Sequence, residues 1–481
     1  MRFLDEFRDY TFPVFSPYHM PLHARRNPIL SFTANRSTTF VSLAALALAG
    51  CATPDSKHVK REELGADLQQ RGLGNVRPAG TGATAQLPPG VSLADGLDET
   101  EAVAIALWNN AAFQENLAKL GFARGDLAQA GMLANPTLSV LFPVGARQLE
   151  LVAALPLEAL WLRPKRIAIA EHEAERVAKG LLQNGLDLAR DVKGGLSDLA
   201  LAADRAEIAA QALKIREEIG SIASRRVRLG DASELDLASA KAEVERAREE
   251  ADRFNRERAI VRGRLSLLLG WPMGEVATIP AMLPSTPPPS VTDIEARALA
   301  ARPDLRAAEL ALESAGKKAG LAESEVFSLA ASVKSTTGSG KEAVVGPGLA
   351  LPIPVLNQNQ PVRIRAGAEV ERAAWSFAGT RDRILAEVRE ARLKVEQASA
   401  ALAAYETQVL PPFEELDRMT RRAYELGELP PLAVQENSRQ LLLLQVRRAE
   451  LRADLRRAWA ELERGVGTSR QNFSSPNPKS P

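Results

Sequence analysis

Cysteine, histidine and aromatic residues are scarce in this chain of 481 residues, which has one Cys, four His and 5% aromatics. A single Cys excludes an intrachain disulfide and a Cys-rich metal site. Lys and Arg number 61 against 60 Asp and Glu, so no field of one sign marks a nucleic-acid partner. The hydrophobic share is nonetheless 45% and consists largely of Ala, Leu and Val, the usual material of long packed helices.

Residues for catalysis are scarce as well. Only His58 and His172 follow the N-terminal signal described below, and neither has the spacing of metal ligands. No P-loop, dinucleotide fingerprint or nucleophile elbow occurs. We therefore expect no enzymatic activity, no cofactor and no bound metal.

The N-terminal residues 1–50 have the pattern of a bacterial secretory signal. Basic residues precede an apolar stretch at 40–49, which is too short to span a bilayer as a helix. Met20 lies a normal signal length upstream, so residues 1–19 are interpreted as an over-extended gene start. The end of the signal, Leu48-Ala49-Gly50-Cys51, resembles the lipobox of bacterial lipoproteins, which implies acylation of Cys51 and delivery to outer-membrane lipid. The alternative is a free thiol. Residues 51–96 are interpreted as a lipidated linker.

The rest of the chain is an internal duplication. Leu229-Gly230 recurs as Leu426-Gly427 at an offset of 197 residues, and Gly270 recurs as Gly467 at the same offset. A Pro-rich connector, 271–291, separates a first repeat at 97–270 from a second at 292–467. Residues 468–481, rich in Ser, Pro and Asn, are expected to be disordered.

Each repeat has the same predicted layout. A helix of about 36 residues, at 99–134 and again at 293–328, leads into a strand region. A long helix then begins at Pro164, or at Pro361 in the second repeat, and a return helix follows at 233–269 or 432–466. Two helices of about 36 residues match one of about 65, or about 100 Å. Pro411-Pro412 are expected to kink the second long helix.

Two β-hairpins are predicted between the helices, at 137–144 with 148–157 and at 327–337 with 344–353. Leu149, Leu151, Ala153 and Leu155 alternate on one face, whereas Lys334 and Ser335 interrupt the second hairpin. Strands of about 8 to 11 residues approach the length that crosses a bilayer at a tilt. Four strands cannot close a membrane barrel, so oligomerisation is implied if they span lipid. A small soluble sheet is the alternative.

Taken together, residues 97–467 resemble the TolC-type outer-membrane factors, especially their lipoprotein branch. The most specific segments are the two helix-turn-helix tips, 225–237 and 421–432. The resemblance implies a mainly α fold, in which duplicated long-helix hairpins form a trimeric α-helical barrel. Two β-hairpins per chain would contribute to a 12-stranded transmembrane β-barrel. It also implies that the tips dock a periplasmic adaptor, through Arg228, Leu229, Gly230, Asp231, Leu426, Gly427 and Glu428.

In that family, acidic side chains six and nine residues after the second tip glycine narrow the entrance. Here the sixth residue is Ala433 and the ninth is Glu436, while Asp236 holds the sixth position in the first repeat. Asp236 and Glu436 are therefore candidate gate and selectivity residues. A solvated helix face is the alternative for either.

The predicted function is that of the outer-membrane channel of a tripartite efflux system. A homotrimer would be a passive exit duct for small molecules or metal ions, joined to a periplasmic adaptor and driven by an inner-membrane pump. Two other classes are a periplasmic adaptor and a structural coiled-coil lipoprotein. The first needs a compact β-rich segment that the duplicated layout does not supply, and the second does not explain two hairpins at equivalent positions.

Overall fold

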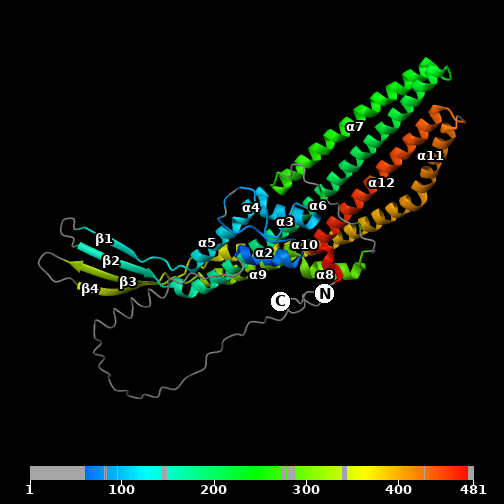
Figure 1. Cartoon of the computed structure of the whole chain (residues 1–481). Coiled ribbons are helices and arrows are strands. Elements are labelled where there is room, and N and C mark those ends of the chain that lie inside the picture. Colours follow the sequence, from blue (N-terminus) through cyan, green and yellow to red (C-terminus); the bar gives the residue numbers. More distant parts are fainter. Residues whose placement is uncertain are drawn as a thin grey trace. The chain divides into compact units, whose positions relative to one another are not determined.

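The computed structural model describes residues 60–474, apart from residues 81, 83, 95, 143–148, 273–277, 279–282, 284–287, 338–343 and 427. All of these described residues fall within Ala52–Pro481, one of the two units of the chain. The predicted signal and Cys51 lie outside the described residues. Helices dominate, and four strands form one sheet (Figure 1). Among the described residues, no helix is both long enough and apolar enough to cross a bilayer.

The longest element is α6, Glu158–Leu229, with 72 residues. The prediction that Pro164 opens this helix is wrong, because Pro164 lies in its second turn. The chain enters the helix earlier because Leu157 N–H donates to Leu329 O at 2.6 Å, while the Glu158 carboxylate accepts from Leu329 N–H at 3.1 Å. These contacts fix the first turn, and Pro164 costs the helix one backbone hydrogen bond.

The predicted single helix at the start of each repeat is broken in both. In the first repeat it is divided into α3 (Glu99–Asn109), α4 (Ala111–Leu117) and α5 (Lys119–Gly131). In the second it is divided into α8 (Val291–Ala301) and α9 (Pro303–Ser324). Asn110 and Arg302 stand at the breaks with nearly the same backbone angles, φ −58° and ψ 117° against φ −68° and ψ 120°. Arg302 precedes Pro303, which disfavours a helical conformation for it.

The return helices, α7 (Glu234–Leu269) and α12 (Pro431–Val466), confirm the prediction and have 36 residues each. Both end at a left-handed glycine, Gly270 at φ 62° and Gly467 at φ 84°. A Cβ on Gly270 would lie 2.4 Å from Asn109 O, and one on Gly467 would lie 3.3 Å from Ala301 O. The end of each return helix therefore packs on the break in the first helix of its own repeat.

The second long helix is interrupted, as Pro411-Pro412 predicted. Helix α10 (Gln360–Ala404), which has Pro361 in its first turn, passes into a π-helical turn, η2 (Tyr405–Val409), and then into α11 (Leu410–Glu425). Neither proline can donate to a carbonyl in the preceding turn, so the chain widens there. Helix α6 has no proline at the corresponding position and continues unbroken.

Helix α6 packs against α5, α7, α9 and α12, and α10 packs against α9 and α12. Each repeat has a separate core of buried apolar side chains. The segment before the first repeat is more than a linker, because α2 (Arg61–Gln70) buries Leu64 and Leu68 in the first core. The predicted disorder of 468–481 is wrong for its first part, since η3 (Arg470–Ser474) places Phe473 against Trp459 in the second core. Residues 475–481 lie outside the described residues.

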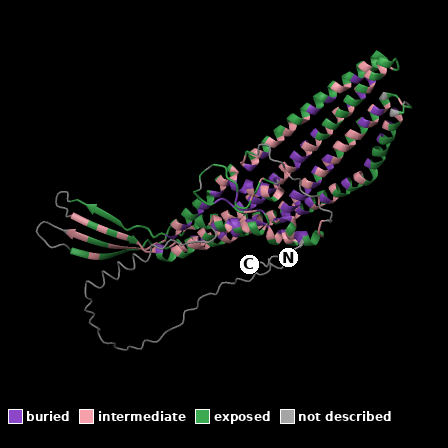
Figure 2. Ribbon diagram, in the orientation of Figure 1, coloured by how far each residue is buried: buried purple, intermediate pink, exposed green. Residues whose placement is uncertain are grey.

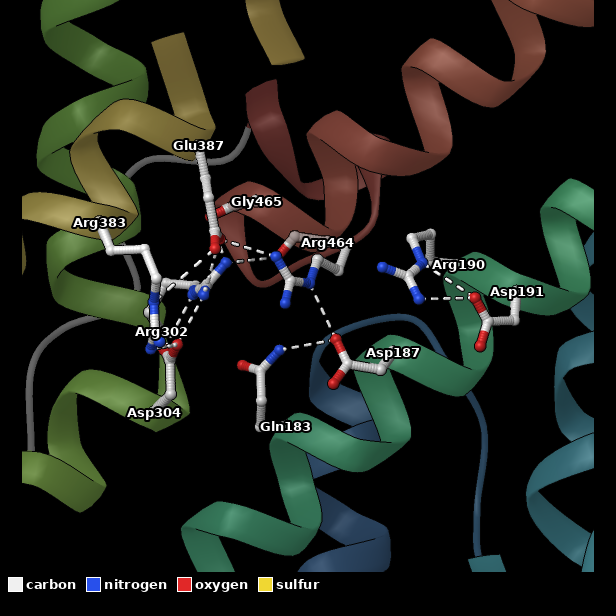
Figure 3. A network of polar contacts seen from close by, with 10 residues as sticks. All are labelled: Gln183, Asp187, Arg190, Asp191, Arg302, Asp304, Arg383, Glu387, Arg464 and Gly465. Carbon is white, nitrogen blue, oxygen red and sulfur yellow. Dashed lines mark hydrogen bonds and ion pairs between the residues drawn. The ribbon is translucent and has the colours of Figure 1, made fainter. Parts of the chain in front are cut away.

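A network of charged side chains joins the break in the second repeat to three other helices (Figure 3). The Arg302 side chain is fully buried and donates to both oxygens of Asp304, at 2.9 and 2.6 Å, and to Glu387 on α10 at 3.1 Å. Arg464 on α12 donates to Glu387 at 2.7 Å and to Asp187 on α6 at 2.8 Å. Because buried Arg302 and half-buried Arg464 both have carboxylate partners, the network fixes these helices relative to one another.

The sheet is antiparallel, with the order β1-β2-β3-β4. Its strands are β1 (Thr137–Leu141), β2 (Leu149–Pro156), β3 (Ala330–Thr337) and β4 (Val344–Ala350). Both predicted hairpins are present, but the strands have 5 to 8 residues and are shorter than predicted. Pairing of β2 with β3 joins the two repeats and leaves β1 and β4 as the edges of the sheet.

Candidate functional site

The two faces of the sheet differ in polarity. Residues paired directly across an antiparallel ladder lie on the same face. The register therefore places on one face, the apolar face, residues 138, 140, 149, 151, 153, 155, 331, 333, 335, 337, 345, 347 and 349. Apart from Ser335 and Thr337, every member of it is apolar, and many are exposed, among them Leu138 and Leu349. Figure 2 shows how little of the sheet is buried.

The opposite face, the polar face, holds both charged residues of the four strands. Glu150 on β2 and Lys334 on β3 are diagonal neighbours there, and Lys334 Nζ lies 2.6 Å from Glu150 Oε1. Hydroxyls of Thr137, Ser139, Ser332 and Thr336 share this face. Lys334 and Ser335 interrupt the apolar pattern of the second hairpin in the sequence. In the sheet, Lys334 lies on the polar face and Ser335 on the apolar face.

The first helical tip, between α6 and α7, is defined by backbone hydrogen bonds. Gly230 adopts φ 82°, its N–H donates to Val227 O at 3.1 Å, and Asp231 N–H donates to Arg226 O at 2.9 Å. These two bonds form a Schellman cap that ends α6. They turn the chain back within a few residues, so that α7 runs beside α6.

Asp236, a candidate gate residue, belongs to a capping box at the start of α7. Its N–H donates to Ser233 Oγ at 3.2 Å, and its carboxylate accepts from Ser233 N–H at 3.1 Å. Hydrogen bonds from the hydroxyl and the backbone of Ser233 lower the pKa of Asp236 below its usual value. The exposed carboxylate stays ionised, and its position is fixed by the helix cap.

The second tip, between α11 and α12, has a similar closing bond. Glu428 N–H donates to Ala423 O at 2.9 Å, and Pro430 precedes the first turn of α12. Gly427, which the sequence places in this turn, lies outside the described residues. Glu428 is exposed.

Four leucines are exposed at equivalent positions of the two tips. Leu229 and Leu426 are 75% and 68% exposed, and Leu235 and Leu432 are 78% and 72% exposed. Each pair is separated by the repeat offset of 197 residues. Leu229 and Leu426 are among the predicted docking residues, whereas Leu235 and Leu432 are not, although the same offset relates them. Exposed apolar side chains repeated in this way are typical of a surface that contacts another protein.

Behind the second tip, polar side chains tie α11 to α12. Buried Ser438 donates to Asp417 Oδ1 at 2.9 Å, and Arg421 Nε donates to Asp417 Oδ2 at 2.6 Å. Glu436, the other candidate gate residue, is exposed on α12, two residues before Ser438. Hydrogen bonds from Arg439 and Gln440 lower the pKa of Glu436 to about 2. The structure does not bring Glu436 and Asp236 into contact within one chain: each carboxylate has partners on its own helix.

Comparison with known proteins identifies the fold. The sequence model of the family described as "Outer membrane efflux protein" matches residues 104–271 and 296–468. The chain belongs to this family. It is a mainly helical outer-membrane efflux protein, and its function is that of an exit duct across the outer membrane. Each of the two matched segments spans one repeat, with its hairpin, its long helix and its return helix.

Individual relatives agree with this family. The cobalt-zinc-cadmium resistance protein CzcC of Cupriavidus metallidurans is 24% identical over 72% of this chain and 84% of its own length. The open state of the outer-membrane channel MtrE of Neisseria gonorrhoeae has a TM-score of 0.64, 19% identity and coverage of 82% of this chain and 97% of that chain. The outer-membrane channel CmeC of Campylobacter jejuni has a TM-score of 0.65, 13% identity and coverage of 86% and 93%. These similarities show a shared fold.

Proposed function

We propose that three copies of this chain assemble into one passive conduit. The observation that carries the proposal is the sheet, which has one apolar face, one polar face and two edges, β1 and β4, that no strand of the described residues pairs with. Backbone N–H and C=O groups at such edges must be paired if the sheet is to lie in lipid. Pairing β4 of one copy with β1 of the next closes a barrel of 12 strands, with the apolar faces toward lipid and the polar faces inward.

The helices support the same closure. Four of the described helices pack in the order α5, α6, α9 and α10. Helices α5 and α10 lie at the two ends of this series, because α5 packs only against α6 in it and α10 only against α9. Phe122 on α5 and Trp375 on α10 are both 73% exposed. Large apolar side chains on outer helices fit burial against a second copy of the chain.

The tips have the properties of a docking surface for a periplasmic adaptor. The four exposed leucines would contact it, and Arg228, Gly230, Asp231, Gly427 and Glu428 would form the rest of the tip surface. Asp236 and Glu436 are the proposed gate carboxylates, ionised near neutral pH and facing the entrance. Energy comes from an inner-membrane pump, and an acyl group on Cys51 holds the chain in the outer membrane. The cargo is small molecules or metal ions, and divalent cobalt, zinc and cadmium are the first to test because of the name of CzcC.

The decisive experiment measures the mass and conductance of the detergent-extracted protein. We expect a trimer mass and discrete conductance steps in a planar bilayer. A Cys51→Ala variant should keep the trimer and lose the acyl mass. A soluble monomer without conductance would contradict the proposal and favour an adaptor or a structural lipoprotein.

A further inference from the structure

The only two charged residues of the four strands lie on the same face and neutralise each other. Lys334 Nζ and Glu150 Oε1 are 2.6 Å apart, and both side chains remain accessible, at 53% and 28% exposure. A charge on the apolar face would be penalised by lipid, whereas the polar face can hold charge in contact with water. The two opposite charges of this ion pair therefore lie on the face of the sheet that can contact water.

We propose that the Lys334–Glu150 pair sets the ion selectivity of the conduit at the level of the sheet. The inference rests on the proposed closure of three sheets with their polar faces inward. Paired, the two charges cancel at short range, so this section of the conduit passes cations and anions with little preference. If either partner is removed, three identical charges remain inside the barrel.

The geometry makes the three pairs independent of one another. In the proposed barrel each sheet contributes four strands, and neighbouring strands lie about 4.8 Å apart, so the backbones that carry successive pairs are about 19 Å apart along the barrel wall. That separation exceeds the Debye length of about 8 to 10 Å at physiological salt. Compensation must therefore come from within each pair, and the described strands offer no other charge to supply it.

A purely structural role predicts different behaviour. A diagonal cross-strand ion pair also stabilises the sheet. If that were its whole effect, Lys334→Gln, Glu150→Gln and the double variant would all weaken the sheet in the same way and leave selectivity unchanged. A role in selectivity predicts opposite shifts for the single variants and none for the double variant.

The test uses the full-length lipoprotein in planar bilayers under a KCl gradient. Lys334→Gln should raise the ratio of cation to anion permeability about two- to fivefold, and Glu150→Gln should lower it by a similar factor. The double variant and the exchanged pair, Lys334→Glu with Glu150→Lys, should have the wild-type ratio. Wild-type ratios in both single variants, in channels of normal conductance, would overturn this inference and leave the conduit intact. Absence of any channel from the wild-type protein would overturn the proposed function and this inference with it.

A second measurement changes the charge after assembly. Lys334→Cys can be modified in the open channel with a cationic or an uncharged thiosulfonate reagent of similar size. The cationic adduct should restore the wild-type ratio, while the uncharged adduct should keep the ratio of Lys334→Gln. Equal effects of the two reagents would show that bulk, and not charge, is responsible, and would overturn the inference.

Discussion

Lys193 on α6 forms ion pairs with two carboxylates, one near the start and one near the end of the described chain. Its Nζ lies 2.6 Å from Glu99 on α3 and also pairs with Glu463 on α12. Burial alone would lower the pKa of Lys193, but the charges of Glu463 and Glu99 raise it above the usual value. The lysine is therefore charged at neutral pH, and its two ion pairs join the two repeats.

Removing this lysine would take from Glu99 its ion-pair partner and would leave buried Glu463 with only Arg470, 3.9 Å away. We expect Lys193→Ala to lower the free energy of unfolding by about 3 to 5 kcal/mol, the usual cost of breaking a buried ion pair. Thermal unfolding followed by circular dichroism measures the effect. Lys394→Ala on α10, which removes an exposed lysine 2.7 Å from Glu390, is the matched control and should cost less than about 1 kcal/mol. Equal losses from the two variants would show that Lys193 has no special role.

Glu173 on α6 makes the stability of the fold depend on pH. Burial alone would raise the pKa of Glu173, but hydrogen bonds from Lys318, Ser314 and Arg176 lower it to about 2. An unfolded Glu has a pKa of about 4.3, so this carboxylate contributes stability above that pH and loses it as the pH falls toward 2. Glu173→Gln should therefore flatten the fall of the unfolding temperature between about pH 5 and pH 2. Glu323→Gln, on the exposed side of α9, should leave that fall unchanged.

At the scale of elements, each tip combines a turn held by hydrogen bonds with leucine side chains that are exposed to solvent. The Schellman cap at Gly230 and the capping box at Ser233 hold the first turn, while Leu229 and Leu235 extend into solvent. The stability of the turn and the proposed docking therefore depend on different atoms, and substitutions can separate the two.

Polar substitutions at the leucines test that separation. Leu229→Gln with Leu426→Gln should weaken binding of the adaptor at least about tenfold, because two apolar side chains would no longer gain from burial against it. The unfolding temperature should stay within about 2 °C, since neither side chain is buried. Binding is measured with the purified adaptor by surface plasmon resonance. Gly230→Ala is the complementary variant, because its left-handed φ of 82° predicts a loss of about 1 kcal/mol in stability.

The sheet permits a test with adjacent residues of one strand. Thr336 lies on the polar face and Ser335 on the apolar face of β3, and both are half-buried. In outer membranes, a water-soluble thiol reagent should modify Thr336→Cys and reduce conductance. Ser335→Cys should react much more slowly, because in the proposed barrel the apolar face lies toward lipid. Equal labelling of both positions would indicate a soluble sheet with both faces in water.

At the scale of the whole molecule, the proposed trimer has to be held by surfaces that one chain leaves exposed. Trp375 on α10 precedes the buried Ile384 by nine residues, which places it about 180° around the helix from the packed face. Phe122 lies on the outer helix α5 and is as exposed as Trp375. These two side chains are the largest apolar groups on the proposed contact.

Loss of both side chains should weaken the trimer and spare the protomer. We expect Phe122→Ala with Trp375→Ala to shift the trimer toward monomer on dilution in detergent, as measured by light scattering. The circular dichroism spectrum should stay unchanged, because neither group belongs to a core within the chain. A trimer as resistant to dilution as the wild type would place the subunit contact elsewhere.

Features that depend on neighbouring residues in the chain could be predicted from the sequence. The duplication, the return helices, the glycine turns and the interruption near Pro411 follow from local periodicity and from the backbone limits of Gly and Pro. Asn110 and Arg302 could have been recognised as helix breaks, since Arg302 precedes a proline and the offset of 192 residues relates the two positions. The candidate tips were predictable for the same reason, because each is a local turn.

Contacts between groups that are distant in the sequence became visible only in the folded chain. Pairing of β2 with β3 brings Glu150 to Lys334, and the packing of α6 on α3 and α12 gives Lys193 its two carboxylates. The same packing orders α2 and the segment up to Phe473, whose compositions resemble a linker and a tail. Periodicity specifies which face of an element is apolar, but not which of many apolar faces will cover it. That choice depends on burial and charge pairing summed over the whole fold, and so the partners of Lys193 and Lys334 could not be predicted from the sequence.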